Sequence, residues 1–100
     1  MSRFVLTSAA REDLEELVAY IAKDSPTAAR RVARELRNSM RKLARLPEMG
    51  HRRSDLCDEP LRFWQVYSFL VIYLPETKPL QILRVLRAAR DVRAILAERP

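Results

Sequence analysis

The stretch from Phe69 to Leu74 reads FLVIYL, six apolar or aromatic residues with no charged residue among them. Such a run predicts a strand, and because side chains alternate along a strand, both faces of its sheet receive apolar groups. A sheet with one face in water alternates apolar and polar residues, and this strand does not. The chain must therefore cover both faces of the sheet, or leave apolar surface for a partner.

Neighbouring segments supply further strands for this sheet. Residues 61–66 precede the apolar run and are joined to it at Tyr67 and Ser68, and Leu80 begins a last strand after the turn 75–79. These short connections predict an antiparallel meander of three strands. The apolar run from Phe4 to Thr7 predicts a first strand, which we expect at the edge of the same sheet.

Two helices are predicted between the first strand and the other three. Thr7 or Ser8 caps the first helix, which ends before Ser25 because Pro26 disfavours helical geometry there. Ser25 then caps the second helix, and Pro47 ends it. We expect the two helices to form a hairpin that covers one face of the sheet. The apolar positions follow the helical repeat and comprise Leu14, Leu17, Val18 and Ile21 in the first helix, and Ala29, Val32, Leu36, Met40 and Leu43 in the second.

The net charge of +6 is concentrated in the second helix. Residues 25–46 hold 7 basic and 1 acidic residue, whereas the segments 1–24, 47–60 and 61–100 carry −2, −2 and +4 and cancel one another. At 100° per residue, five arginines fall within about 80° of one another, opposite the apolar stripe: Arg30, Arg34, Arg37, Arg41 and Arg45. We interpret this stripe as solvated surface. The basic balance favours an anionic partner, either nucleic acid or an acidic protein.

The stretch from Leu80 to Asp91, LQILRVLRAARD, is expected to begin as a strand and to end at the start of a last helix. Asp91 is placed to cap a short helix over residues 92–97. The stretch and this helix carry the candidates for binding a target, because guanidinium groups pair bidentately with carboxylates or phosphates: Arg84, Arg87, Arg90 and Arg93. For Arg90 a structural role is the alternative, as a tie to Glu12 or Glu16 of the first helix.

The second face of the sheet has only the short last helix to cover it. Val92, Ile95 and Leu96 are its apolar residues. Two outcomes follow from the pattern: the helix covers this face completely, or it leaves apolar surface rimmed by Arg62, Arg84 and Arg87 and open to a protein partner.

The remaining loop, residues 47–60, is polar and lies between two prolines. Its Gly50 is the only glycine, and we expect it to supply a positive φ angle. His51 and Cys57 lack the further nitrogen or sulfur ligands that zinc needs, so no metal site is predicted.

Residues with catalytic chemistry are not grouped in the sequence. There is no glycine-rich phosphate loop and no Ser/His/Asp set, and arginine can stabilise developing charge but cannot readily act as a base. We predict one domain spanning residues 1–100, with no catalytic residue and no cofactor. The single cysteine suits a reducing cytoplasm, and no apolar run approaches the roughly 18 residues of a membrane span.

Most of the chain resembles the RelE/ParE superfamily of toxins from type II toxin–antitoxin modules, and specifically its ParE branch. The similar segments are SAAREDLEELVAYIA, DSPTAARRVARELRNSMRKLARLPEMG, LRFWQVYSFLVIYLP and QILRVLRAARDV. The last is similar to the usual RVLHGARD, with Arg87 in place of histidine and Ala88 in place of glycine. The resemblance implies an α+β fold in the order β-α-α-β-β-β-α, with a helical hairpin packed on a small antiparallel sheet and a short C-terminal helix.

ParE-like members resemble inhibitors of DNA gyrase that trap the enzyme on cleaved DNA. The resemblance implies gyrase as the target and a cognate acidic antitoxin that wraps this chain and alone contacts operator DNA. Candidate antitoxin contacts lie on the hairpin and the sheet: Leu17, Tyr20, Arg62, Phe69 and Tyr73.

RelE-like members, by contrast, are ribosome-dependent mRNA endonucleases. They typically carry an arginine on the middle strand and a tyrosine or histidine near the C-terminus, where this chain has Leu70 and Ala94. An mRNA interferase and a degenerate toxin that only binds its antitoxin remain the alternatives.

Overall fold

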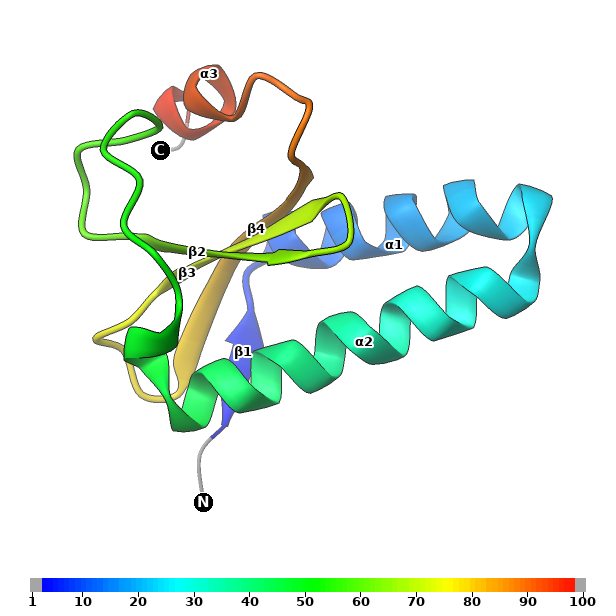
Figure 1. Ribbon diagram of the computed structural model, residues 1–100, viewed down its shortest axis with the longest axis horizontal. Coiled ribbons are helices and arrows are strands. Elements are labelled where there is room, and N and C mark those ends of the chain that lie inside the picture. The colour runs from blue at the N-terminus through cyan, green and yellow to red at the C-terminus, as the bar shows by residue number, and fades with distance from the viewer. Residues whose placement is uncertain (1–2, 99–100) are drawn as a thin grey trace.

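The computed structural model describes residues 3–98. The elements follow one another in the predicted order β-α-α-β-β-β-α, with a short 3-10 turn after the second helix (Figure 1). They are β1 (Phe4–Leu6), α1 (Ser8–Asp24), α2 (Pro26–Arg45), the 3-10 turn η1 (Pro47–Met49), β2 (Arg62–Val66), β3 (Phe69–Leu74), β4 (Leu80–Arg87) and α3 (Val92–Ala97).

The four strands form one sheet in the order β1-β4-β3-β2. The last three make the predicted antiparallel meander, and β1 joins its edge. The pairing of β1 differs from the expected antiparallel sheet. β1 runs parallel to β4, with Phe4 opposite Leu80 and Leu6 opposite Ile82. Both strands run toward the end of the sheet at which helices α1 and α3 begin.

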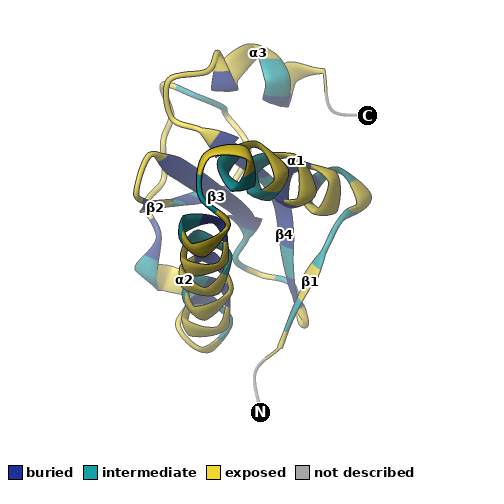
Figure 2. Cartoon of the chain, turned by 90° about the vertical axis from the view of Figure 1, so that its right-hand side faces the viewer, coloured by how far each residue is buried: buried dark blue, intermediate teal, exposed yellow. Residues whose placement is uncertain are grey.

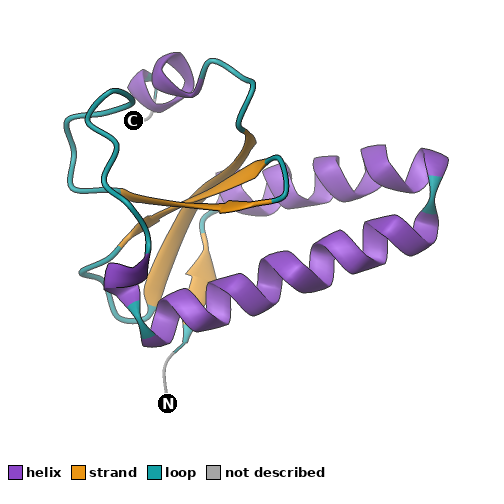
Figure 3. Ribbon diagram, viewed as in Figure 1, coloured by secondary structure: helices purple, strands orange, loops and turns teal. Residues whose placement is uncertain are grey.

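The hairpin of α1 and α2 covers one face of the sheet and extends beyond it (Figures 1 and 3). Its turn is built on Ser25, whose N–H donates to Ile21 and ends α1 while its Oγ accepts from the N–H of Ala28 and caps α2. None of the described helices combines the length and the apolar character needed to cross a membrane.

The apolar middle strand is buried on both faces, as Figure 2 shows. Phe69, Val71 and Tyr73 pack against the hairpin, with side chains such as Leu36 and Met40 of α2. On the opposite face, α3 and the loop before β2 cover Leu70, Ile72 and their neighbours. The core of this second face consists of Leu61, Phe63, Leu70, Ile72, Leu83, Leu86, Val92 and Leu96, with Leu56, Cys57, Leu74 and Ile95 packed against it.

Within residues 3–98, the apolar side chains that form or flank the core of this second face are all buried or half-buried, so the face does not offer the expected apolar surface rimmed by Arg62, Arg84 and Arg87. That expectation is wrong, and the alternative, cover by the last helix, is correct with help from the loop. Leu70 and Ile72, at the centre of this face, are only 5% and 0% exposed.

Gly50 does not have the positive φ expected of it. Its φ is −72° and its ψ is 169°, which is extended backbone, and the positive φ among described non-glycine residues belongs to Tyr67 in the turn between β2 and β3. Gly50 is required for space, because a Cβ there would collide with the Tyr73 hydroxyl. The Gly50 N–H donates to that hydroxyl at 2.9 Å, and the hydroxyl donates to the carbonyl of Pro47 at 2.7 Å.

Tyr73 is thus a core residue with no exposed surface. The prediction that it contacts an antitoxin is wrong for this conformation, because its ring fills the space between the sheet, α2 and the loop. Burial raises the pKa of its hydroxyl above the ordinary value of 10.0.

Candidate functional site

An open pocket of ≈ 350 Å³ lies where α1 passes the end of β4. We call it the α1–β4 pocket. It brings together residues far apart in the sequence, from α1, from the start of β3, from the end of β4 and from the turn that follows β4. Its lining consists of Asp13, Glu16, Leu17, Tyr20, Phe69, Val85, Leu86, Arg87 and Arg90. Three candidate antitoxin contacts and two candidate target contacts therefore share one site.

The rim of this pocket carries a stacked pair of exposed side chains. The guanidinium carbon of Arg87 lies 4.5 Å from the ring centroid of Tyr20, which is 57% exposed. A cation over a tyrosine face is attracted by the ring and held in one orientation, while its N–H groups stay free at the edge. Within residues 3–98, neither Arg87 nor Arg90 forms an ion pair, so the alternative tie between Arg90 and Glu12 or Glu16 is not formed. Both guanidinium groups are available to a partner.

Asp13, which lines the pocket, forms an ion pair with Arg84. The carboxylate of Asp13 accepts from Arg84 Nε at 2.7 Å and Nη2 at 2.8 Å, and also from the N–H of Val85 at 3.0 Å. Asp13 is 9% exposed, and its hydrogen bonds to Arg84 raise the pKa of that guanidinium. Arg84 therefore joins α1 to β4, and we reassign it from a target contact to a structural link.

The position of α1 follows from the shortness of β1. Because β1 ends opposite Ile82, the edge of β4 continues with no neighbouring strand. Side chains of α1 and its cap take the place of that strand: Thr7 Oγ1 donates to the carbonyl of Leu83 at 2.9 Å, and Asp13 accepts from Val85. The helix is thereby fixed along the edge of β4, and the pocket forms beside it.

The other predicted contacts lie outside the pocket. Arg93 donates to the carbonyl of Asp55 at 3.2 Å and ties α3 to the loop. Arg62, at the start of β2, donates to the carbonyl of Gly50 at 2.7 Å and pairs with Glu48 at 2.8 Å. Arg62 and Arg93 both hold the loop between α2 and β2. Because Arg93 lies at this loop and Arg84 pairs with Asp13, the four arginines of the last segment do not form one patch.

Asp13 was not singled out from the sequence, and Glu16 was considered only as a possible partner of Arg90. A signal for Asp13 was present, because it lies four residues before Leu17 and seven before Tyr20, on the same face of α1. An acid at such a position is expected to find a buried partner. Within the described part of the chain, no group of three His, Cys, Asp or Glu residues is placed to hold a metal.

Comparison with known proteins gives the class of this fold. A solved structure described as "Chromosomal ParDE TA system from P. aeruginosa" superposes with a TM-score of 0.68 at 22% sequence identity, covering 87% of this chain and 96% of that chain. At this identity the match shows the fold alone. No curated protein sequence matches.

The family follows from the sequence itself. Residues 4–92 match the family model described as the ParE toxin of the type II toxin–antitoxin system, parDE. The chain belongs to this family of toxins, and membership implies an antitoxin as its partner.

Proposed function

We propose that this toxin acts by binding DNA gyrase on DNA, with Arg87 and Arg90 as the principal contacts, and that it is not an enzyme. The observation that supports this most directly is the pair of guanidinium groups that line the α1–β4 pocket and form no ion pair within residues 3–98. A gyrase–DNA complex offers both carboxylates and phosphates, and guanidinium groups bind either in a bidentate manner. Stacking on Tyr20 holds Arg87 ready for such a contact and reduces the entropy lost on binding.

The composition of the pocket supports binding in preference to catalysis. Its buried carboxylate, Asp13, is fully occupied by Arg84 and Val85, and the lining includes no histidine or lysine. A ribonuclease needs a base for the 2′-hydroxyl and an acid for the leaving oxygen. For these roles the lining offers only the exposed Glu16 and Tyr20, and Tyr20 is stacked under Arg87.

We propose further that a cognate acidic antitoxin neutralises the toxin by occupying the same pocket. Leu17, Tyr20 and Phe69 offer an apolar floor and wall beside the two arginines, so an amphipathic helix with acidic side chains fits both parts. An antitoxin bound in the α1–β4 pocket would then block gyrase from the same pocket directly. In this proposal the toxin meets gyrase in the cytoplasm, and the operator sequence is recognised only through the antitoxin.

Purified toxin in a gyrase supercoiling assay, beside an in vitro translation assay, tests this function. We expect inhibition of supercoiling and normal translation. Arg87→Ala and Arg90→Ala should each raise the inhibitory concentration about tenfold or more, since a charged hydrogen bond contributes about 1.5–3 kcal/mol, while the melting temperature stays unchanged.

Arg52→Ala is the matched control, because Arg52 is exposed and lies outside the pocket. It should inhibit like the wild type. Inhibition of translation in place of supercoiling would instead assign an mRNA interferase, and activity in neither assay would leave a protein that only binds its antitoxin. Loss of inhibition together with a lower melting temperature would give Arg87 a structural role.

A further inference from the structure

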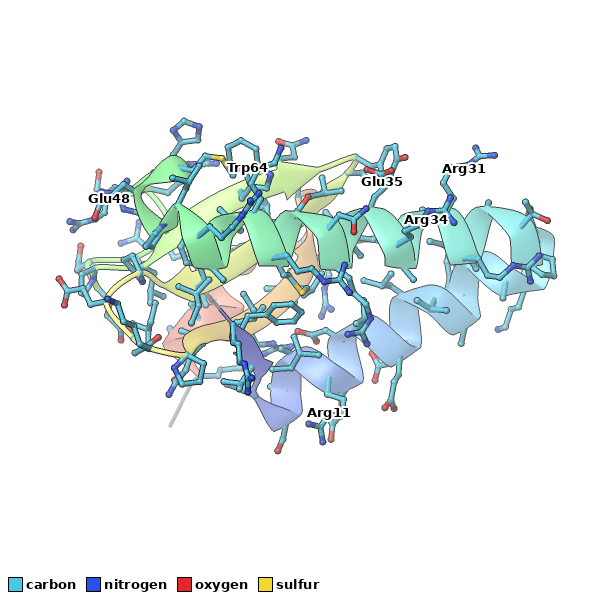
Figure 4. The ribbon with its side chains drawn as sticks, turned by 90° about the horizontal axis from the view of Figure 1, so that it is seen from below. Arg11, Arg31, Arg34, Glu35, Glu48 and Trp64 are labelled. Carbon is cyan, nitrogen blue, oxygen red and sulfur yellow. The ribbon has the colours of Figure 1, made fainter. Side chains whose placement is uncertain are left out.

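The outer face of α2 carries an unneutralised line of positive charge. All seven of its basic residues are exposed: Arg30, Arg31, Arg34, Arg37, Arg41, Lys42 and Arg45. Within residues 3–98 none of them forms an ion pair, and their side-chain hydrogen bonds are those of Arg30 to Thr27 and Arg41 to Asn38. Figure 4 shows Arg31 and Arg34 on the edge of α2 that faces away from α1.

The charges form a straight row. From Arg30 to Arg45 the helix rises about 22 Å, at 1.5 Å per residue, and five arginines repeat along it at intervals of three or four residues. Glu35, the single acid of α2, lies about 120° around the helix from the middle of this row. We call the five residues Arg30, Arg34, Arg37, Arg41 and Arg45 the α2 arginine row.

Within the chain, the row makes only local contributions to α2. Arg45 lies in the last turn, where the helix dipole favours a cation, and Arg30 and Arg41 donate to Thr27 and Asn38 of the same helix. Like charges three and four residues apart repel one another and weaken a helix. The apolar residues of α2 that form the core, such as Leu36 and Met40, lie on the opposite side of the helix. A row of like charges that forms no ion pair or hydrogen bond with another element of residues 3–98 is suited to a ligand outside the protein.

The surroundings of the row indicate the kind of ligand. α2 contains no aromatic residue, so it has no platform on which the bases of a single strand could stack. Its outer face also exposes no large apolar side chain; the exposed ones within residues 3–98 are Val5, Tyr20, Leu46 and Tyr67, none of which belongs to α2. A protein partner would find no apolar centre for an interface there.

We propose that the α2 arginine row binds the phosphate backbone of duplex DNA without regard to sequence. Duplex DNA carries one negative charge per about 1.7 Å of its axis, so a rigid row of about 22 Å meets phosphates along its whole length. No residue of α2 lines the α1–β4 pocket, and the row therefore leaves that pocket free for a protein. The proposal is independent of gyrase, because it concerns DNA alone.

The test is fluorescence anisotropy of the purified toxin with a labelled duplex of random sequence, titrated at several salt concentrations. With five phosphate contacts, the logarithm of the binding constant should fall against the logarithm of salt with a slope of about −4 to −5. The triple variant Arg34→Gln, Arg37→Gln and Arg41→Gln should lose about three units of that slope and at least tenfold in affinity at low salt.

A control triple with the same loss of charge is Arg11→Gln, Arg52→Gln and Lys78→Gln, all at exposed positions outside α2. It should change the slope by less than one unit. A second variant with lysine at positions 34, 37 and 41 keeps the charge and should keep most of the binding, because phosphate contact needs only a point charge. Circular dichroism and melting curves check that each variant is folded.

Several results would overturn the proposal. Equal losses in the two triple variants would reduce the effect to net charge, and tighter binding to a single strand of the same length would exclude duplex recognition. Loss of antitoxin binding in the row variant with DNA binding intact would assign the row to the antitoxin. Inhibition of gyrase is measured separately, so failure of DNA binding and failure of the proposed target remain distinguishable.

Discussion

At the scale of single residues, Asp13 connects two elements that lie far apart in the sequence. Its carboxylate joins α1 to β4 through three hydrogen bonds, two from Arg84 and one from the backbone of Val85. The partners lie 71 and 72 residues away in the sequence. Asp13 serves two purposes. It accepts a hydrogen bond from the Val85 N–H on the unpaired edge of β4, and with Arg84 it holds α1 where Tyr20 can stack on Arg87.

We expect Asp13→Asn to lower the free energy of unfolding by about 2 kcal/mol, because it leaves a partly buried guanidinium without its counter-charge. The expected loss is smaller than for a fully buried ion pair, because the Arg84 side chain is 24% exposed and water screens part of the interaction. Urea unfolding measures the change. Glu15→Gln on the exposed side of α1 is the control and should stay within about ±0.5 kcal/mol; an equally small effect of Asp13→Asn would contradict the role given to this pair.

Tyr73 makes the stability of the protein depend on alkaline pH. Its pKa is raised in the folded state mainly by burial, so the unfolded chain releases the hydroxyl proton at a lower pH than the folded chain. The stabilisation from this hydroxyl is complete below the pKa that Tyr73 has in the unfolded chain, near 10. It is lost as the pH rises through the higher pKa that Tyr73 has in the folded chain. This one group should reduce the free energy of unfolding by up to about 1.4 kcal/mol per pH unit in that window.

Tyr73→Phe removes that part of the pH dependence and, at neutral pH, costs about 1–3 kcal/mol because the Gly50 N–H is left unpaired. Tyr67→Phe is the matched control, since Tyr67 is 57% exposed, and it should keep both the wild-type stability and the wild-type slope. Denaturant unfolding from pH 8 to pH 11 gives both quantities. Parallel pH curves for the wild type and Tyr73→Phe would rule out the assignment.

At the scale of elements, α1 acts as the neighbour that β4 lacks beyond Ile82. Thr7 makes this possible, because its hydroxyl accepts from the N–H of Ala10 at 3.1 Å and donates to the carbonyl of Leu83 at 2.9 Å. The same residue thus caps the helix and ties it to the strand. Of the two cap candidates in the sequence, the structure selects Thr7.

Thr7→Ala should therefore destabilise the protein by about 1.5–3 kcal/mol, from the lost cap and the lost bond to β4. Ser8→Ala should have almost no effect, because Ser8 is exposed and is already the first residue of the helix. Thermal and urea unfolding of the two variants provide the comparison. Equal effects would mean that Thr7 makes no special contribution.

At the scale of the whole molecule, the hairpin is divided into an acidic and a basic helix. Within Ser8–Asp24, α1 has 5 acidic and 2 basic residues, whereas α2 has 1 acidic and 7 basic residues. The pocket is lined partly by the acidic helix α1 and partly by the basic residues Arg87 and Arg90. A partner that enters the pocket is therefore oriented by the field of the entire hairpin.

We expect an acidic antitoxin to associate at a rate that falls as salt rises, while its dissociation rate changes little, since long-range attraction acts mainly on the encounter. Stopped-flow measurements between 50 mM and 500 mM salt test this. Arg87→Ala should slow association and weaken its salt dependence, because Arg87 is an exposed charge at the rim of the pocket. A salt-independent association rate would show that charge does not guide the antitoxin.

The sequence by itself determined the elements and their order. Caps, prolines and apolar repeats are local signals, so the hairpin at Ser25, the meander and the last helix after Asp91 could be predicted from them. The unbroken apolar run Phe69–Leu74 also determined that both faces of the sheet had to be covered. The match of residues 4–92 to the ParE toxin family rests on the same ordered set of features.

Only the tertiary structure decided how the polar side chains divide. Arg84, Arg87, Arg90 and Arg93 look alike in the sequence, but β4 alternates its faces and α3 turns the chain to the other side of the sheet. One arginine therefore pairs with Asp13, two reach the pocket, and one holds the loop. The role of Gly50 was likewise hidden, because the ring that needs its missing side chain arrives from a strand 23 residues later. Contacts between distant residues depend on packing, and packing leaves no local pattern in the chain.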